Sequence, residues 1–181
     1  MTIWMTSDWH LHHFNIIKYC NRPFLYTDEM NRAIKDKFLE RVKEGDTVYF
    51  LGDLSFKKGD WFKMNCMSFF RNVPAEMIFL FGNHDKMKQQ DYEDMGFKVV
   101  TKDPIELYIN GTHLLLTHEP TNIDSNEIVN VHGHVHDKWR TTFLGATKTL
   151  GVNVSVEVWD YYPVSLEEVF DEINKTKEFQ T

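Results

Sequence analysis

Four short apolar runs, each ending in polar residues, constrain the fold of this chain more than any other feature. They are rich in β-branched or aromatic residues and lie at 3–5, 47–51, 77–81 and 114–116. Short runs of this kind predict buried strands. The polar clusters that follow them begin at Ser7, Gly52, Gly82 and His118. In open α/β sheets, groups beyond the carboxyl ends of the strands form the ligand crevice, so we expect these clusters to share one edge.

Helical patterns separate the first strands. Residues 27–42 carry apolar side chains at four-residue spacing, with Thr27 or Asp28 as the expected N-terminal cap and Gly45 just beyond the end. A second helix is predicted over residues 61–70, before Pro74. The first half of the chain therefore alternates strand and helix, as parallel crossover units do.

The second half carries the pattern of a second sheet. Short strands are predicted at 99–100, 105–109, 113–117, 128–131, 142–144 and 149–158. Ser165 is expected to cap a last helix over residues 166–174, and the tail from residue 176 to be frayed. No repeat or linker divides the chain, so residues 1–181 are interpreted as a single domain. The predicted fold class is α/β: a four-layer sandwich of two facing mixed β-sheets flanked by helices.

Composition limits the partners of the protein. Twenty Lys and Arg residues against 27 Asp and Glu residues give a net charge of -7, which disfavours extensive nucleic-acid binding but not a small phosphate-ester substrate. Two cysteines without CxxC spacing favour a reducing, cytoplasmic setting. No uncharged apolar run approaches the roughly 20 residues of a membrane span, and no signal peptide is visible, so we expect a soluble protein.

The polar clusters are rich in metal-binding side chains. Together with a fifth cluster at residues 132–136 they supply aspartates, an asparagine and several histidines, a donor set that suits Mn, Fe, Zn or Ni. Asp8 and His10 are two residues apart, as are His134 and His136, so in an extended segment each pair leaves the same face. Gly52, Gly82 and Gly133 permit tight turns and close backbone approach beside these residues.

In this order, the clusters resemble the motifs of the calcineurin-like metallophosphoesterase superfamily, in particular its short phage and bacterial members. The matching blocks are Asp-x-His at 8–10, Gly-Asp at 52–53, Gly-Asn-His-Asp at 82–85, His118, and Gly-His-x-His at 133–136. The resemblance implies two divalent metal ions. Asp8, His10 and His136 would hold one ion, Asn83, His118 and His134 the other, and Asp53 would bridge both.

Such a centre hydrolyses phosphate esters. Two ions about 3.5–4 Å apart activate a bridging hydroxide that attacks phosphorus while both ions neutralise the phosphoryl oxygens. His84 is not a ligand in the family pattern and is the candidate to assist the leaving group, with Asp85 orienting it. Two roles stay open for His84, a general acid or an electrostatic stabiliser.

Substrate contacts are harder to assign from the sequence. His13 and Asn15 belong to an Asp-x-His-x-x-His-x-Asn variant of the first motif and are candidates to line the substrate pocket, although they can equally cap the loop. Arg22 is a candidate phosphate ligand, with surface placement as the favoured alternative for both Arg22 and Arg140. His132 is expected to hydrogen-bond locally, and His113 to face solvent.

The family comparison also narrows the substrate. The arginine that phosphoprotein phosphatases carry after the Gly-Asp block is absent, although Lys57 or Lys58 could replace it. This absence favours small phosphodiesters or nucleotides over phosphoproteins. Two alternatives stay open, a nuclease of the same superfamily and a catalytically inactive scaffold that binds proteins. The native metal and the oligomeric state are not determined by the sequence.

Overall fold

The first of two sheets carries the N-terminal strands. The structure, a computed structural model, describes residues 1–123, 125–146 and 148–178. Sheet 1 has the strand order β10-β1-β2-β3-β4, in which β1 to β4 are parallel and β10 is antiparallel to β1. Its strands are β1 (Ile3–Thr6), β2 (Thr47–Phe50), β3 (Glu76–Leu80), β4 (Val99–Thr101) and β10 (Val164–Ser165).

Sheet 2 is built from the second half of the chain. Its order is β5-β6-β7-β9-β8, with three parallel central strands and antiparallel strands at both edges. The strands are β5 (Ile105–Ile109), β6 (Thr112–Leu116), β7 (Ile128–His132), β8 (Thr141–Leu144) and β9 (Thr149–Asn153). The predicted pair of mixed sheets flanked by helices is therefore confirmed.

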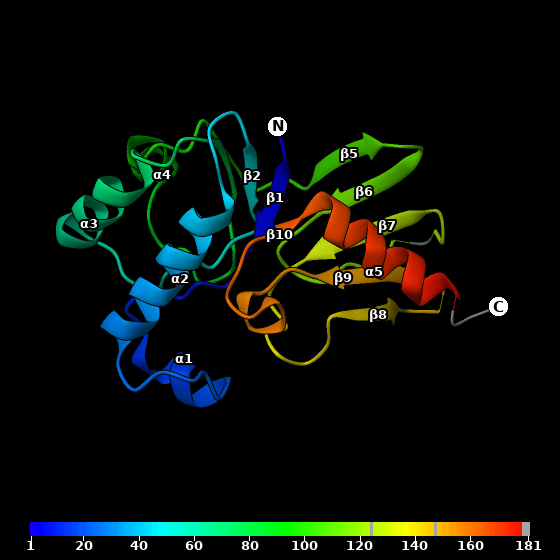
Figure 1. The fold of residues 1–181 in the computed structure, drawn as a ribbon, viewed down its shortest axis with the longest axis horizontal. Coiled ribbons are helices and arrows are strands. Elements are labelled where there is room, and N and C mark those ends of the chain that lie inside the picture. Colours follow the sequence, from blue (N-terminus) through cyan, green and yellow to red (C-terminus); the bar gives the residue numbers. More distant parts are fainter. Residues whose placement is uncertain (124, 147, 179–181) are drawn as a thin grey trace.

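Helices flank both sheets. Four of them lie on the side of sheet 1 that faces away from sheet 2: α1 (Phe14–Tyr19), α2 (Thr27–Arg41), α3 (Asp60–Phe70) and α4 (Gln89–Met95) (Figure 1). The last helix, α5 (Leu166–Glu178), runs across sheet 2 after a short 3-10 helix, η1 (Val156–Trp159) (Figure 1). Among the helices that the structure describes, none is both long and apolar enough to cross a membrane.

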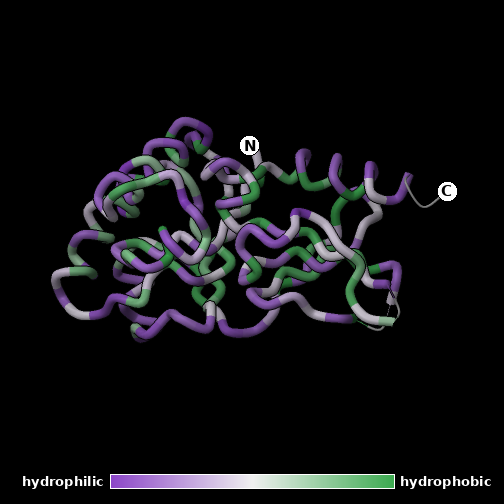
Figure 2. Tube along the Cα trace, turned by 90° about the horizontal axis from the view of Figure 1, so that it is seen from below, coloured by the Kyte–Doolittle hydropathy of each residue, from purple (hydrophilic) through white to green (hydrophobic). Residues whose placement is uncertain are grey.

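Two apolar cores hold these layers together. The core between sheet 1 and its helices is aromatic, and in it Trp9 lies 5.2 Å from both Phe38 and Phe50, measured between ring centroids. The second core joins the sheets to α5 through residues such as Met5, Leu116 and Ile173. Figure 2 shows apolar segments running through the interior of both halves. Because both cores bury strands of sheet 1, the ends of β1, β2 and β3 are fixed relative to sheet 2.

Several element boundaries differ from the predictions. Helix α2 begins at Thr27 itself, so Tyr26 occupies the cap position and neither Thr27 nor Asp28 caps the helix. The predicted strand over 149–158 ends at Asn153 because the chain turns there into η1. The short helices α1 and α4 were not predicted from their weak periodicity. Helix α5 extends to Glu178, so residues 176–178 are helical, and residues 179–181 lie outside the described part of the chain.

The predicted cap of the last helix is confirmed. The Ser165 hydroxyl accepts the backbone N–H of Glu168 at 3.1 Å, and the Glu168 carboxylate accepts the N–H of Ser165 at 2.8 Å. This reciprocal pair is a capping box, which satisfies two donors at the helix start.

Candidate active site

The candidate metal ligands follow the ends of β1, β2, β3, β6 and β7, and the structure brings all seven together. The loops are tied by backbone hydrogen bonds, from the N–H of Asp8 to the carbonyl of Gly52 and from the N–H of His10 to the carbonyl of Asp53, both 3.0 Å. Five of the seven adopt positive φ angles, namely Asp8, His10, Asp53, His134 and His136. The expectation that the paired ligands project from extended segments is therefore wrong. Left-handed residues in tight loops direct them instead.

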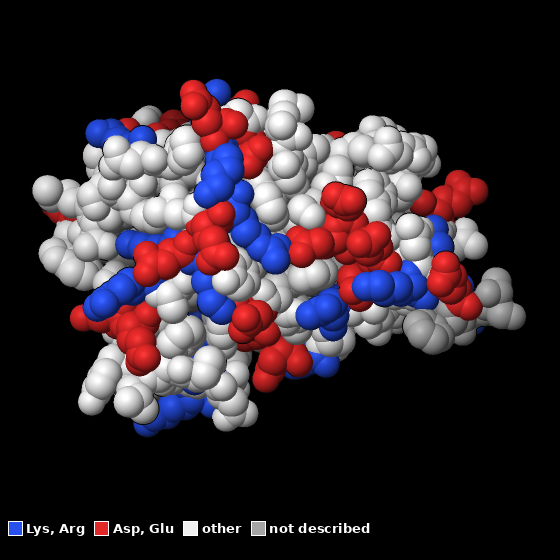
Figure 3. Space-filling model, viewed as in Figure 1, with Lys and Arg blue, Asp and Glu red and all other residues white. Residues whose placement is uncertain are grey.

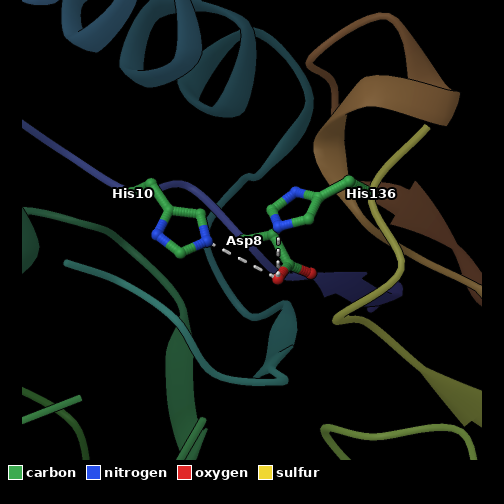
Figure 4. A group of neighbouring side chains, drawn as sticks. All are labelled: Asp8, His10 and His136. Atoms are coloured by element: carbon green, nitrogen blue, oxygen red, sulfur yellow. Dashed lines mark ion pairs between the residues drawn. The ribbon is translucent and has the colours of Figure 1, made fainter. Parts of the chain in front are cut away.

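Asp8 has one oxygen anchored and the other directed at histidines. Its Oδ2 accepts three hydrogen bonds, from Ser7 Oγ at 2.6 Å, Ser155 Oγ at 2.8 Å and the N–H of His134 at 2.9 Å. Its buried Oδ1 has no hydrogen-bond partner among the described residues and lies 3.8 Å from His10 Nε2 and 3.9 Å from His136 Nε2 (Figure 4). One carboxylate oxygen is thus fixed in place, while the described residues supply no hydrogen-bond partner for the other.

Asp53 repeats this arrangement. Its Oδ1 accepts the N–H of His84 at 2.9 Å. Its Oδ2 lies 3.5 Å from His10 Nε2 and 3.4 Å from His118 Nε2, so that this oxygen stands between two imidazoles. The side chain is 1% exposed. The position between histidines from separate motifs is the one expected for a residue that bridges two cations.

His118 is oriented by a hydrogen bond on the far side of its ring. His118 Nδ1 lies 2.8 Å from the Leu51 carbonyl, which turns Nε2 towards Asp53. Asn83 Oδ1 lies 2.9 Å from His118 Nε2 and 3.3 Å from His134 Nδ1. Both ring nitrogens of His10 are buried and have no hydrogen-bond partner within the described residues. Fixed tautomers with one nitrogen free are typical of metal-binding histidines.

The carboxylates make the site attract positive charge. Burial lowers the pKa of His118, but Asp53 and Asp8 outweigh it and raise that pKa to about 9. Burial likewise opposes the charge of Asp53, yet His118 and His10 lower its pKa to about 2. Burial dominates at His10, whose pKa falls well below 6.5. The carboxylates that raise the pKa of His118 are electrostatically suited to a bound cation.

The donor set fits divalent metal ions. Asp8, His10 and His136 offer ligand atoms that all lie within 4.8 Å of one another, and so do Asp8, Asp53 and His118. The orphaned Oδ1 of Asp8 and the Nε2 of His10, which lie 3.8 Å apart, would gain a partner from a bound ion. Carboxylate, amide and imidazole donors are ligands that Mn, Fe, Zn and Ni accept. These groups therefore fit the two cations that the motifs imply.

Two glycines permit the close approach of the loops. A Cβ on Gly52, which has φ of +89°, would lie 2.5 Å from the backbone nitrogen of Gly82 and 2.7 Å from His118 Nδ1. A Cβ on Gly82 would lie 2.5 Å from the backbone nitrogen of Asp53. Side chains at these two positions would push apart the loops that carry the candidate ligands, so the close approach predicted for them is confirmed.

Comparison with known proteins agrees with this geometry. A sequence model of the calcineurin-like phosphoesterase superfamily domain matches residues 1–170. The chain belongs to this superfamily. It is 36% identical over 185 residues to an uncharacterized protein of Methanocaldococcus jannaschii, MJ1445. The alignment covers 99% of this chain and 95% of that relative.

A solved structure shares the fold. The protein of unknown function AQ665 from Aquifex aeolicus aligns with a TM-score of 0.72 at 25% identity, over 94% of this chain and 98% of its own. The family match over residues 1–170 therefore agrees with the order of the motifs along the chain. The names of these two relatives state no activity.

His84 lies beside the candidate cation ligands. Its ring centroid is 5.7 Å from that of His10 and 3.9 Å from that of Phe56. Its Nε2 lies 3.1 Å from the amide nitrogen of Asn83. Burial is the main cause that lowers the pKa of His84, with a smaller opposing effect of Asp53. His84 therefore lies next to the candidate ligands His10 and Asn83.

Asp85 does not orient His84, and this prediction is wrong. Its carboxylate points to the backbone behind the site, where Oδ2 accepts the N–H groups of Asp53 at 2.7 Å and Gly82 at 2.8 Å. Its Oδ1 accepts the N–H of Leu54 at 3.0 Å and the Tyr92 hydroxyl at 3.1 Å. Asp85 therefore ties together the two loops that carry Asp53 and Asn83.

Arg22 is buried, so its expected surface placement is wrong, and so is its candidacy as a phosphate ligand. It is 4% exposed, and its guanidinium donates to Glu157, to the carbonyls of Asp8 and Trp9, and to the Met30 sulfur. These contacts use all five N–H groups. Arg140 is exposed, as predicted, and donates to the Val158 carbonyl.

The remaining predicted contacts divide between pocket and scaffold. His13 lines a cavity of about 380 Å³ together with His10, His84, His134 and His136. Asn15 is exposed and borders a neighbouring recess with Lys57, outside that cavity. His132 Nδ1 bonds the Gly133 carbonyl at 2.9 Å, which confirms its local role. His113 is paired with Glu106 at 3.0 Å and stacked on Tyr108 rather than free in solvent.

Sequence reasoning missed the residues that hold the ligands in place. Asn153 is the last residue of β9 and donates to the His136 carbonyl at 2.7 Å, and Ser155, two residues later, anchors Asp8. Glu157 Oε1 lies 2.9 Å from His136 Nδ1. None of them belongs to a motif of the family. The only signal in the sequence was a polar interruption, Asn153 and Ser155, in a run that otherwise reads as a strand.

Proposed function

We propose that this chain is a two-cation phosphodiesterase that acts on small phosphodiesters or nucleotides. The proposal rests on one observation: the carboxylates of Asp8 and Asp53 have the same arrangement of contacts. Each is buried, each has one oxygen fixed by protein donors, and each directs the other oxygen at two histidines. Asp8, His10 and His136 would hold one cation and Asn83, His118 and His134 the other, with Asp53 shared.

The cations and the protein divide the chemistry. When bound, two divalent ions supply Lewis-acid activation of water and of the phosphoryl oxygens. The chain's own contribution beyond the ligands is His84. If Asn83 directs its Oδ1 to the cation ligands, its amide nitrogen donates to His84 Nε2. His84 Nδ1 then carries the hydrogen of the neutral imidazole and can donate a hydrogen bond to the oxygen of the leaving group, which stabilises the negative charge that develops there.

The shape around the ligands supports a diester. The cavity of about 380 Å³ borders the ligand set at His10, His134 and His136, and it is walled by Phe56, Tyr19 and Ile16. A second recess, of about 560 Å³, borders the set at Asn83 and His118 and contains Lys86 and Lys102. A phosphodiester carries two substituents on phosphorus, so two recesses on either side of the ligands match its form.

The surface supports a small substrate. On the face that carries α2 and α5, acidic side chains lie beside the basic ones over most of the surface (Figure 3). With a net charge of -7, the protein lacks the basic surplus that nucleic-acid backbones require. Cys20 and Cys66 are unpaired, which supports the proposed reducing, cytoplasmic setting.

The test is a comparison of substrates with one metal-loaded preparation. We expect kcat/KM with Mn²⁺ to be higher for small aryl and nucleoside phosphodiesters than for a phosphopeptide or duplex DNA at low salt, where nucleic-acid binding is strongest. Higher efficiency on the duplex would identify a nuclease. Binding of two cations without hydrolysis of any of these esters would identify an inactive scaffold. Either result would refute the proposed function.

A further inference from the structure

A buried ion pair stands behind one of the candidate cation ligands. Glu157 lies on η1, and its side chain is 3% exposed. Its Oε1 lies 2.9 Å from His136 Nδ1, while His136 Nε2 faces Asp8 Oδ1 at 3.9 Å. The imidazole thus has one nitrogen bound to Glu157 and the other directed into the site.

Arg22 holds Glu157 in that position. Its Nε and Nη2 donate to Glu157 Oε1 at 3.0 and 2.5 Å, and its side chain is fully buried. The same guanidinium donates to the carbonyls of Asp8 at 2.7 Å and Trp9 at 2.9 Å. One cation-anion pair therefore connects the loop of the Asp8 motif with the loop of His136.

We propose that Glu157, held by Arg22, is a positioning residue that fixes the tautomer and orientation of His136 for one of the two cations. The proposal rests on the proposed two-cation function. A carboxylate behind a metal-binding imidazole accepts its N–H and strengthens the other nitrogen as a ligand. The arrangement is asymmetric, because the corresponding partner of His118 is the uncharged Leu51 carbonyl at 2.8 Å. Loss of Glu157 should therefore weaken the binding of the cation held by His136 and leave the binding of the other cation unchanged.

A different use of Glu157 is less consistent with its contacts. Cys20, His136 and Glu157 also offer ligand atoms within 4.8 Å of one another. However, Glu157 Oε1 already accepts two N–H groups from the positively charged Arg22, which would repel a cation placed there. Glu157 therefore acts on the site through His136 rather than as a ligand.

The experiment measures cation binding without turnover. Metal-free protein is titrated with Mn²⁺ by calorimetry, and its thermal unfolding is recorded in parallel. We expect Glu157→Gln to lower the affinity for one of the two ions by roughly 10- to 100-fold and to leave the affinity for the other unchanged. In a protein that already carries His136→Ala, Glu157→Gln should cause no further loss, because its effect passes through His136.

Two further variants keep the test decisive. Glu157→Asp retains the charge beside Arg22 but withdraws the carboxylate from His136, so it should weaken the same ion even if Glu157→Gln does not fold. Glu168→Gln is the matched control. Glu168 forms an ion pair with Arg41, with 2.8 Å between Oε2 and Nη1, and this pair lies outside the candidate site. The substitution should leave the affinity for both ions unchanged.

Three results would overturn the positioning role. The first is wild-type affinity for both ions in folded Glu157→Gln and Glu157→Asp proteins. The second is an equal loss of affinity for both ions. The third is a loss that persists in the His136→Ala background, which would indicate a general structural effect. If the wild-type protein bound no cation, the proposed function itself would fail and this inference with it.

Discussion

Removal of the Asp85 carboxylate should destabilise the protein more than it alters the chemistry of His84. The carboxylate accepts four hydrogen bonds, and two of the donors are the N–H groups of the buried residues Asp53 and Leu54. An unsatisfied buried donor costs about 1–3 kcal/mol, so these two alone give about 2–6 kcal/mol. We therefore expect Asp85→Ala to lower the free energy of unfolding by about 3–6 kcal/mol, a large share of the roughly 5–15 kcal/mol of a typical domain.

Urea unfolding of the metal-free protein at pH 8 measures this loss. Burial, and then the neighbouring Asp53, raise the pKa of Asp85 to about 7, so charging this carboxylate at pH 8 costs the folded protein stability and the net loss in Asp85→Ala should fall towards the lower end of the expected range. Tyr92→Phe is the matched control, because it removes one of the four donors and keeps the ring that stacks on Phe79 at 4.3 Å. It should cost about 1.5–3 kcal/mol. An unchanged free energy of unfolding in Asp85→Ala would refute the tethering role.

Two further predictions concern His84 and Asp46. His84→Ala should still bind both cations. It should slow hydrolysis by about 10²–10⁴-fold for an ester with an alkyl leaving group, and by less for an ester that releases nitrophenolate. Equal losses in kcat on the two esters would instead indicate that His84 is an electrostatic stabiliser. At Asp46, burial opposes the charge, but donors from Thr2, Trp4 and Lys43 outweigh it and lower the pKa. The stabilisation is therefore present above the unfolded pKa of about 3.9 and is lost as the pH falls through the lower folded value. The difference in unfolding free energy between the wild type and Asp46→Asn should shrink below pH 4, and a constant difference would contradict this.

The sequence predicted the features that depend on local pattern. Apolar runs identified β1, β2 and β3 because a buried parallel strand is apolar on both faces. The four-residue spacing of Met30, Ile34 and Phe38 identified α2. The order of the polar clusters predicted which side chains would meet, since strand ends of one sheet share an edge.

What the sequence could not predict depends on contacts between distant segments. Glu157 is 135 residues from Arg22 and 21 from His136, so no spacing indicated that they would meet. The direction of the Asp85 side chain depends on the turn after β3, which points it to the backbone of Asp53 instead of to its neighbour His84. The burial of Arg22 follows from the carbonyl groups of the Asp8 loop, whose left-handed conformation no local pattern specified.

The most direct test of the account is a titration of metal-free protein with Mn²⁺ while the hydrolysis of a small phosphodiester is followed. We predict that the rate rises until two ions are bound per chain and then stays constant, and that Asp53→Ala weakens the binding of both ions and abolishes the activity. Saturation at a single ion, hydrolysis without any cation, or an Asp53→Ala protein that retains two tightly bound ions would contradict the shared role of Asp53.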